Sequence, residues 1–166
     1  MADKTLDTLF HDTLRDIYYA ERKILKSLPK MKRAARSDAL KAAFEKHESQ
    51  TEGQIERLEK VFEIIGKTPR GKTCDAINGI LDEGDEIAEE YKDSPALDAG
   101  LLAVAQAVEH YEITRYGTLK RWATVLGLDD AVKLLDETLE EESQTDEDLT
   151  SIADASINEA ALKDAA

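Results

Sequence analysis

Four glutamates of this sequence lie at positions where a helical pattern calls for apolar side chains. They are Glu21, Glu48, Glu112 and Glu142, one in each of four long periodic segments. Glu21, for example, lies between Ile17 and Ile24, at the three- and four-residue spacing that marks the buried face of a helix. Counted from the two short helix turns, the four acids lie at heights that differ by only about 3 to 5 Å along the helix axes. We therefore expect their carboxylates to meet at one level of the protein interior.

Carboxylates gathered in a protein interior need a compensating group. Each negative charge raises the pKa of its neighbours, and removal from water raises it further. Protons, cationic side chains or metal ions can compensate them. Carboxylate oxygens together with one or two imidazoles suit iron and manganese. The sequence therefore predicts a site for iron or manganese. Its expected ligands are the four glutamates and three flanking residues, that is Glu21, Glu48, Glu109, Glu112, Glu142, His47 and Glu141.

A buried polar network without a metal ion is the alternative interpretation. Arg115 lies one helical turn from Glu112 on the same face and can pair with it. His110 and several tyrosines can donate hydrogen bonds to the acids. A shift of one residue in the phase of the apolar stripe would also turn Glu48 and Glu142 towards solvent. The sequence alone leaves both interpretations open.

Five helical segments are expected to carry these residues, at 5–35, 38–65, 74–91, 95–126 and 129–155. Ser37 and Asp129 are suitable N-caps, and Ser94 followed by Pro95 is a strong signal for a helix start. Gly66 and Gly127 follow apolar periodic runs, where a glycine commonly ends a helix. Periodicity and cap signals thus agree on an all-helical chain.

The connections between these segments predict how the helices pair. Very short links at 36–37 and 127–128 make two antiparallel hairpins, and the segment between the hairpins is long enough to cross from one to the other. Two hairpins joined by one long crossover are typical of ferritin-like bundles. The hairpins look like copies, since Glu-Ser-Gln-Thr recurs at 48–51 and 142–145. We expect one all-α domain over residues 1–166, a ferritin-like four-helix bundle with a short fifth helix in the crossover, a core at 5–155 and a flexible tail at 156–166.

Composition narrows the function classes. The chain has 166 residues, 42% hydrophobic and 35% charged, with a formal net charge of −14 and one cysteine, Cys74. Nucleic acids and anionic membranes are poor partners for so acidic a chain, because both attract positive charge. Residues 1–10 lack the apolar run of a signal peptide, and no stretch approaches the roughly 20 apolar residues that span a bilayer. We expect a cytoplasmic protein.

Four segments of the chain resemble the YciE/YciF family of bacterial, stress-associated, ferritin-like proteins, whose members are often assigned as ferroxidases. They are Tyr-Ala-Glu at 19–21, Gly-Gln-Ile-Glu-Arg-Leu at 53–58, Val-Glu-His-Tyr-Glu-Ile at 108–113 and Glu-Thr-Leu-Glu-Glu-Glu at 137–142. The resemblance covers residues 5–153 and implies a homodimer with distant kinship to rubrerythrin-type di-iron bundles, in which Glu109 and Glu112 match a ligand pair. The chain departs from that pattern at Thr51 and Thr145, which stand where histidines are expected.

Two functions follow from the acids and the resemblance. The first is a carboxylate-rich di-metal protein that oxidises Fe(II) or consumes peroxide, with Tyr18 or Tyr111 as a possible electron relay. The second is a metal-free, dimeric structural or interaction protein that has kept the fold and lost the site. In either case the crossover helix, through Ile80, Leu81 and Ile87, is a candidate for the dimer interface.

Overall fold

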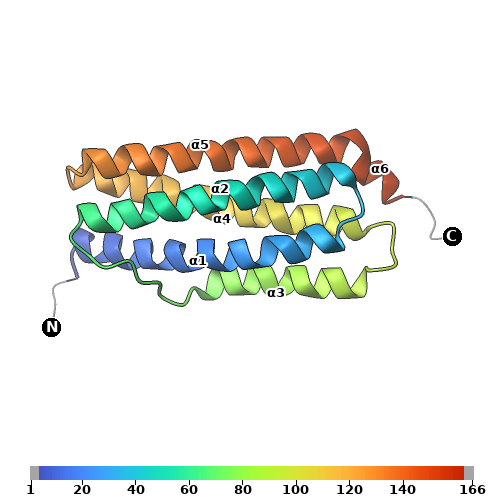
Figure 1. The fold of residues 1–166 in the computed structure, drawn as a ribbon, viewed down its shortest axis with the longest axis horizontal. Coiled ribbons are helices and arrows are strands. Elements are labelled where there is room, and N and C mark those ends of the chain that lie inside the picture. The colour runs from blue at the N-terminus through green and yellow to red at the C-terminus, as the bar shows by residue number, and fades with distance from the viewer. Residues whose placement is uncertain (1–3, 163–166) are drawn as a thin grey trace.

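The computed structural model describes residues 4–162, and every regular element within this range is helical. Five helices make up most of it: α1 (Leu6–Ala34), α2 (Asp38–Ile64), α3 (Asp75–Glu90), α4 (Leu97–Val125) and α5 (Asp129–Ile152). A π-helical turn, η1 (Ala153–Ile157), and a short α6 (Asn158–Ala160) follow α5 (Figure 1). The expectation of an all-α bundle is confirmed. None of the helices in the described range is both long and apolar enough to cross a membrane.

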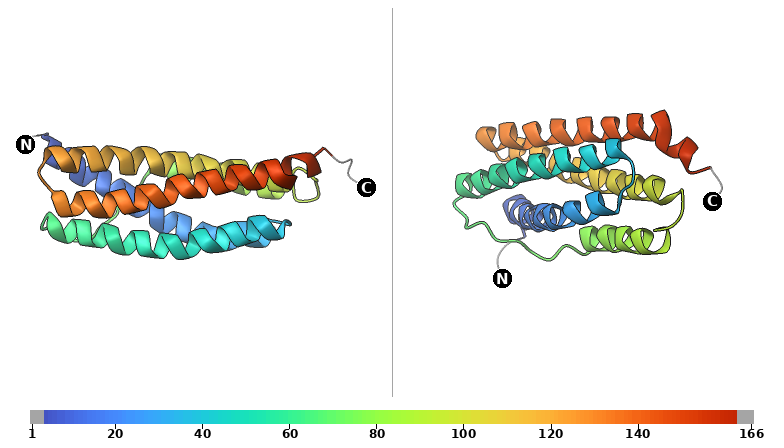
Figure 2. Two further views of the ribbon diagram at one scale, coloured as in Figure 1. Left: turned by 90° about the horizontal axis from the view of Figure 1, so that it is seen from above. Right: turned by 45° about the vertical axis from the view of Figure 1, so that its right-hand side comes forward.

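The four long helices run along the length of the molecule as two antiparallel hairpins, α1 with α2 and α4 with α5 (Figures 1 and 2). Helix α3 lies outside the four, against α1 and α4, along the half of the bundle that contains the α1–α2 turn (Figure 1). Each long helix turns its apolar stripe inward, and the stripes form one continuous core. The bundle thereby brings one face of each long helix to a shared interior.

Two glycines end helices as the sequence predicts. Gly66 after α2 and Gly127 after α4 have φ angles of 67° and 71°, in the left-handed region that glycine adopts without strain. The next amide in each turn reaches back to the helix, from Lys67 to the Phe62 carbonyl and from Leu128 to the Ala123 carbonyl, both at 2.9 Å. The second turn is therefore tight, and α5 returns directly along α4.

Helical structure continues to Ala160, beyond the expected end of the last helix at residue 155. Ala153 and Ile157 continue the buried stripe of α5 at a spacing of four and are 7% and 3% exposed, so burial keeps this segment helical. Residues 163–166 lie outside the described range.

The turn between α1 and α2 is fastened to the start of α4. The Asp98 carboxylate accepts hydrogen bonds from the backbone amides of Arg36, at 2.8 Å, and Ser37, at 2.6 Å. The Arg36 guanidinium donates in turn to the backbone carbonyls of Ser94 and Lys92. These contacts hold the two hairpins in register at this end.

Replacing Asp98 with alanine tests this link. We expect Asp98→Ala to lower the free energy of unfolding by about 1 to 2 kcal/mol, because two amides lose a charged acceptor. Urea denaturation followed by circular dichroism measures the change. Asp93→Ala removes an exposed acid of the preceding turn and serves as the control. Equal stability of the two variants would contradict the link.

Candidate metal centre

A cluster of three carboxylates and one imidazole occupies the middle of the bundle. His47 comes from α2, Glu109 and Glu112 from α4, and Glu142 from α5. One ligand atom of each residue lies within 4.8 Å of the corresponding atom of every other. The four residues are at most 4% exposed. Three helices therefore direct potential metal ligands at one point in the interior.

Helix α1, the remaining long helix, contributes Glu21 at the same level of the interior. Its side chain is fully buried, and the Tyr116 hydroxyl donates a hydrogen bond to its Oε1 atom. Burial, followed by the negative charge of Glu142, raises the pKa of Glu21 to about 8. Glu21 lies outside the group of four but belongs to the same electrostatic unit.

Many polar atoms of the cluster have no hydrogen-bond partner within the protein. They are both ring nitrogens of His47, both carboxylate oxygens of Glu112, and one oxygen each of Glu21, Glu109 and Glu142. The closest approaches join Nε2 of His47 to Oε1 of Glu109 at 3.5 Å and to Oε2 of Glu112 at 3.8 Å. Buried polar groups are normally satisfied, so these atoms need either protons shared between neighbouring carboxyl groups or a bound cation. An ion coordinated by oxygen and imidazole nitrogen fits the donor set.

The protonation states favour a cation in the same place. Burial raises the pKa of Glu109 and Glu112 well above the ordinary range, and the nearby Glu142 raises both further. Burial also lowers the pKa of His47, which leaves its imidazole neutral with a lone pair to donate. Burial and mutual repulsion therefore favour the protonated form of Glu109 and Glu112 when no cation is present. A divalent ion can take the place of those protons.

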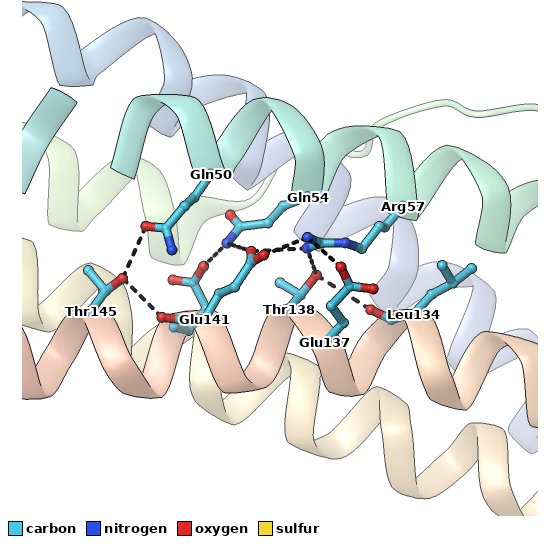
Figure 3. A network of polar contacts seen from close by, with 9 residues as sticks. Gln50, Gln54, Arg57, Leu134, Glu137, Thr138, Glu141 and Thr145 are labelled. Carbon is cyan, nitrogen blue, oxygen red and sulfur yellow. Dashed lines mark hydrogen bonds and ion pairs between the residues drawn. The ribbon is translucent and has the colours of Figure 1, made fainter. Parts of the chain in front are cut away.

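A polar network between α2 and α5 supports one side of the cluster (Figure 3). The Gln54 amide donates from Nε2 to Oε2 of Glu141 at 3.0 Å and also to Oε1 of Glu142. Arg57 pairs with Glu141 and, at 3.0 Å, with Glu137. The guanidinium therefore neutralises the acids nearer the surface, while the amide fixes one oxygen of Glu142 and leaves the other free.

The seven predicted ligands divide into three groups. His47, Glu109, Glu112 and Glu142 come together, and Glu21 lies beside them. Glu141 is drawn aside by Arg57, and 26% of its side chain is exposed. Glu48 is only half-buried and is not one of the clustered residues, so its predicted place in the core was wrong.

The error at Glu48 has a simple geometric cause. Steps of three then four residues and steps of four then three both join Phe44 to Thr51, and the sequence does not choose between them. The structure takes the first path, so His47 fills the buried position and Glu48 lies to one side. Gln54 continues this path three residues after Thr51, and that spacing was the signal that could have identified it.

The polar groups named for a metal-free network contribute unevenly. Tyr116 does bind an acid beside the cluster, Glu21. Arg115 instead stacks over the Tyr111 ring at 5.3 Å. His110 pairs at 3.0 Å with Asp146, which is more exposed than the acids of the cluster. The Thr51 and Thr145 hydroxyls donate to backbone carbonyls of their own helices, at 2.8 and 2.9 Å. Helices α2 and α5 therefore supply one clustered ligand each.

Comparisons with known proteins identify the relatives of this chain. A sequence profile of DUF892, a domain of unknown function, matches residues 5–162. Protein YciF of Escherichia coli strain K12 is 43% identical over 160 residues, which span 95% of this chain and 96% of YciF. The crystal structure of the E. coli stress protein YciF is similar with a TM-score of 0.89 and 41% identity, covering 94% of this chain and 99% of that one. YcfI of Rhodopseudomonas palustris, for which a structural role has been suggested, is similar with a TM-score of 0.86 and 47% identity, covering 89% and 94%. The resemblance read from the sequence is confirmed.

The raised pKa of Glu21 predicts how stability depends on pH. The folded protein holds the Glu21 proton up to about pH 8, whereas the group's ordinary pKa is 4.5. The stabilisation is therefore fully present below pH 4.5 and is lost as the pH rises towards 8. We expect the melting temperature of metal-free protein to fall over this interval, and to fall less in Glu21→Gln, which has no proton to lose.

Differential scanning calorimetry across this pH range, with a chelator present, measures the effect. Glu52→Gln changes an exposed acid of α2 and should retain the wild-type pH dependence. The assignment fails if Glu21→Gln and Glu52→Gln respond to pH alike.

Proposed function

We propose that this chain, which belongs to the DUF892 family, binds iron or manganese between its four long helices. The observation that supports this proposal is the set of buried oxygen and nitrogen atoms, contributed by His47, Glu109, Glu112, Glu142 and Glu21, that have no partner within the protein. The first four residues would hold the metal, and Glu21 would offer a further carboxylate beside them.

The chain's own residues would prepare the site in distinct ways. Gln54 holds one oxygen of Glu142, so that the carboxylate presents the other. Arg57 keeps the charge of Glu141 out of the cluster. Tyr116 orients Glu21 through its hydroxyl. Each of these contacts reduces the freedom of a ligand before an ion arrives, which lowers the cost of binding.

We propose Fe(II) as the substrate of an oxidation at this site. A bound iron ion supplies one-electron chemistry that side chains lack. With dioxygen as oxidant, two Fe(II) ions would give up two electrons, and dioxygen would take these with two protons to form one molecule of hydrogen peroxide. The tyrosine in contact with a cluster-side carboxylate is Tyr116, whereas Tyr18 donates to Glu59 and Tyr111 lies 3.0 Å from the Cys74 sulfur. Tyr116 thus replaces the two tyrosines expected from the sequence as the residue to test for electron transfer.

A metal-free structural role is the second candidate. It is favoured by Thr51 and Thr145, which occupy positions where a di-iron bundle would have histidines and whose hydroxyls are used within their own helices. In this case protons alone neutralise the buried acids, and YcfI, with its suggested structural role, is the better guide. The two candidates differ in whether metal is bound in stoichiometric amount.

Metal titration separates the two candidates. We expect anaerobic Fe(II), or Mn(II), to raise the melting temperature of the wild type, because a ligand that binds only the folded state stabilises it. Glu112→Gln should abolish the rise, and binding should weaken at lower pH, where protons compete for the ligands. Glu140→Gln, an exposed acid of α5, is the control.

The opposite result would favour the structural candidate. The melting temperature of the wild type would then stay the same with either metal, and Glu21→Ala would stabilise the fold. Together these results would show that the buried acids repel one another and bind no metal. Isothermal titration calorimetry and elemental analysis of protein purified without chelator give the stoichiometry directly.

We also propose that the chain forms a homodimer. The three apolar residues expected at the interface, Ile80, Leu81 and Ile87, are half-buried against the core of their own chain, so only their remaining surface is free for a partner. Static light scattering at micromolar concentration should give twice the chain mass of 18.5 kDa. A mass equal to that of the single chain would exclude a stable dimer.

A further inference from the structure

A small cavity adjoins the cluster on the side of the α1–α2 turn. It leaves about 20 Å³ for the centre of a water-sized molecule. All five helices line it, with Leu28 of α1, Phe44 of α2, Val108 of α4 and Leu149 of α5 among the apolar residues of its wall. Space of this size holds one small molecule, since a single water needs roughly 10 to 15 Å³ by the same measure.

Most of the cavity wall is apolar, and its polar residues are His47, Glu109, Ser27 and Thr145. His47 and Glu109 both line the cavity and both belong to the carboxylate cluster. Both His47 ring nitrogens and Oε2 of Glu109 lack partners in the protein. The side of the cavity nearer the surface is made of the half-buried residues Ser27, Met31, Ala43 and Leu81. The cavity therefore extends from beneath α3 to the edge of the cluster.

Along the helices, the cavity lies on one side of the cluster and most of the polar network lies on the other, while Thr145 belongs to both. On α2, Phe44 of the cavity is followed by His47 of the cluster and then by Arg57 of the network. The same order, read in reverse, holds on α5, from Leu149 to Glu142 to Thr138. One side of the cluster is closed by hydrogen bonds, and the other opens into a mostly apolar space.

We propose that this cavity admits and holds dioxygen directly beside His47 and Glu109. A small apolar molecule enters a mostly apolar cavity without losing hydrogen bonds. The choice of dioxygen among apolar molecules rests on the proposed oxidation of Fe(II), whereas the capacity of the cavity for such a molecule does not.

Dioxygen itself is the probe in the first experiment. It is paramagnetic and accelerates the relaxation of nearby protons, so methyl NMR under oxygen pressure locates it. In metal-free protein, we expect the enhancement at Leu28, Val108 and Leu149 to exceed severalfold that at Leu14 and Leu119, which are equally buried elsewhere in the core. Xenon should reduce the enhancement by competing for the same space. Equal enhancement at both sets of methyls, or a bound water that contacts the cavity methyls, would overturn the proposal.

Two variants and a control locate the effect. Ala105→Leu fills the cavity from α4 and should abolish the enhancement at Leu28 and Leu149. Ala103→Leu adds the same atoms to the exposed face of α4 and should leave it unchanged. Val108→Ala enlarges the cavity and should increase the enhancement at Leu28, so this variant decides the question if Ala105→Leu does not fold. Enhancement that persists in folded Ala105→Leu, or that does not grow in Val108→Ala, would overturn the proposal.

The absence of metal keeps this test independent of the proposed function. If the protein binds no iron but shows the enhancement, the proposed gas cavity stands and the proposed metal site fails. If the protein binds iron but shows no enhancement, only the proposal that the cavity holds dioxygen fails.

Discussion

The burial of carboxylates without matching cationic side chains is the constraint on which the rest of this structure depends. Glu21, Glu112 and Glu142 are each 0% exposed and Glu109 is 2% exposed. The nearest guanidinium partner in the network, Arg57, binds Glu141 and Glu137 instead. Well-packed apolar residues at such positions are often neutral or stabilising by comparison. Retaining four acids at this level therefore costs stability, and that cost is the physical argument for a role of the cluster beyond packing.

The acidity of the chain has two separate origins in the structure. Many acids lie on the surface, where Lys46 with Asp148 and Lys30 with Asp85 form exposed ion pairs between helices. Such pairs contribute little to stability. The interior acids are few, and burial raises the pKa of Glu21, Glu109 and Glu112. The net charge of −14 reflects mainly the first group, and it therefore says little about the site.

The sequence predicts the helices well because their signals are local. Gly66, Gly127 and the apolar steps of three and four residues depend on no distant contact. The site is less accessible, since a residue enters it only if the phase of its helix is known to one position. Both His47 and Glu48 satisfy the periodicity of α2, and only packing against α4 and α5 selects His47. The sequence also predicts too short a helical segment at the end of the chain. Burial keeps Ile157 of η1 in a helical conformation, and the small and polar residues around it give no sign of this burial.

The cavity is harder still to predict from the sequence, because no motif marks an unfilled volume. It arises where side chains from all five helices leave space that none of them fills. Its position gives the cluster two unlike sides. On the side of Gln54 and Arg57, charged and polar groups reach from the surface to Glu142. On the side of Leu28 and Phe44, most of the wall is apolar, and Ser27 and Thr145 are its polar residues besides His47 and Glu109. A hydrated cation would have to shed its water to pass such a wall at large cost, whereas an apolar gas loses nothing there. The arrangement that would admit dioxygen from one side thus keeps ions from following it, and it leaves the side with hydrogen-bonding groups as the route by which a cation can approach with its charge compensated.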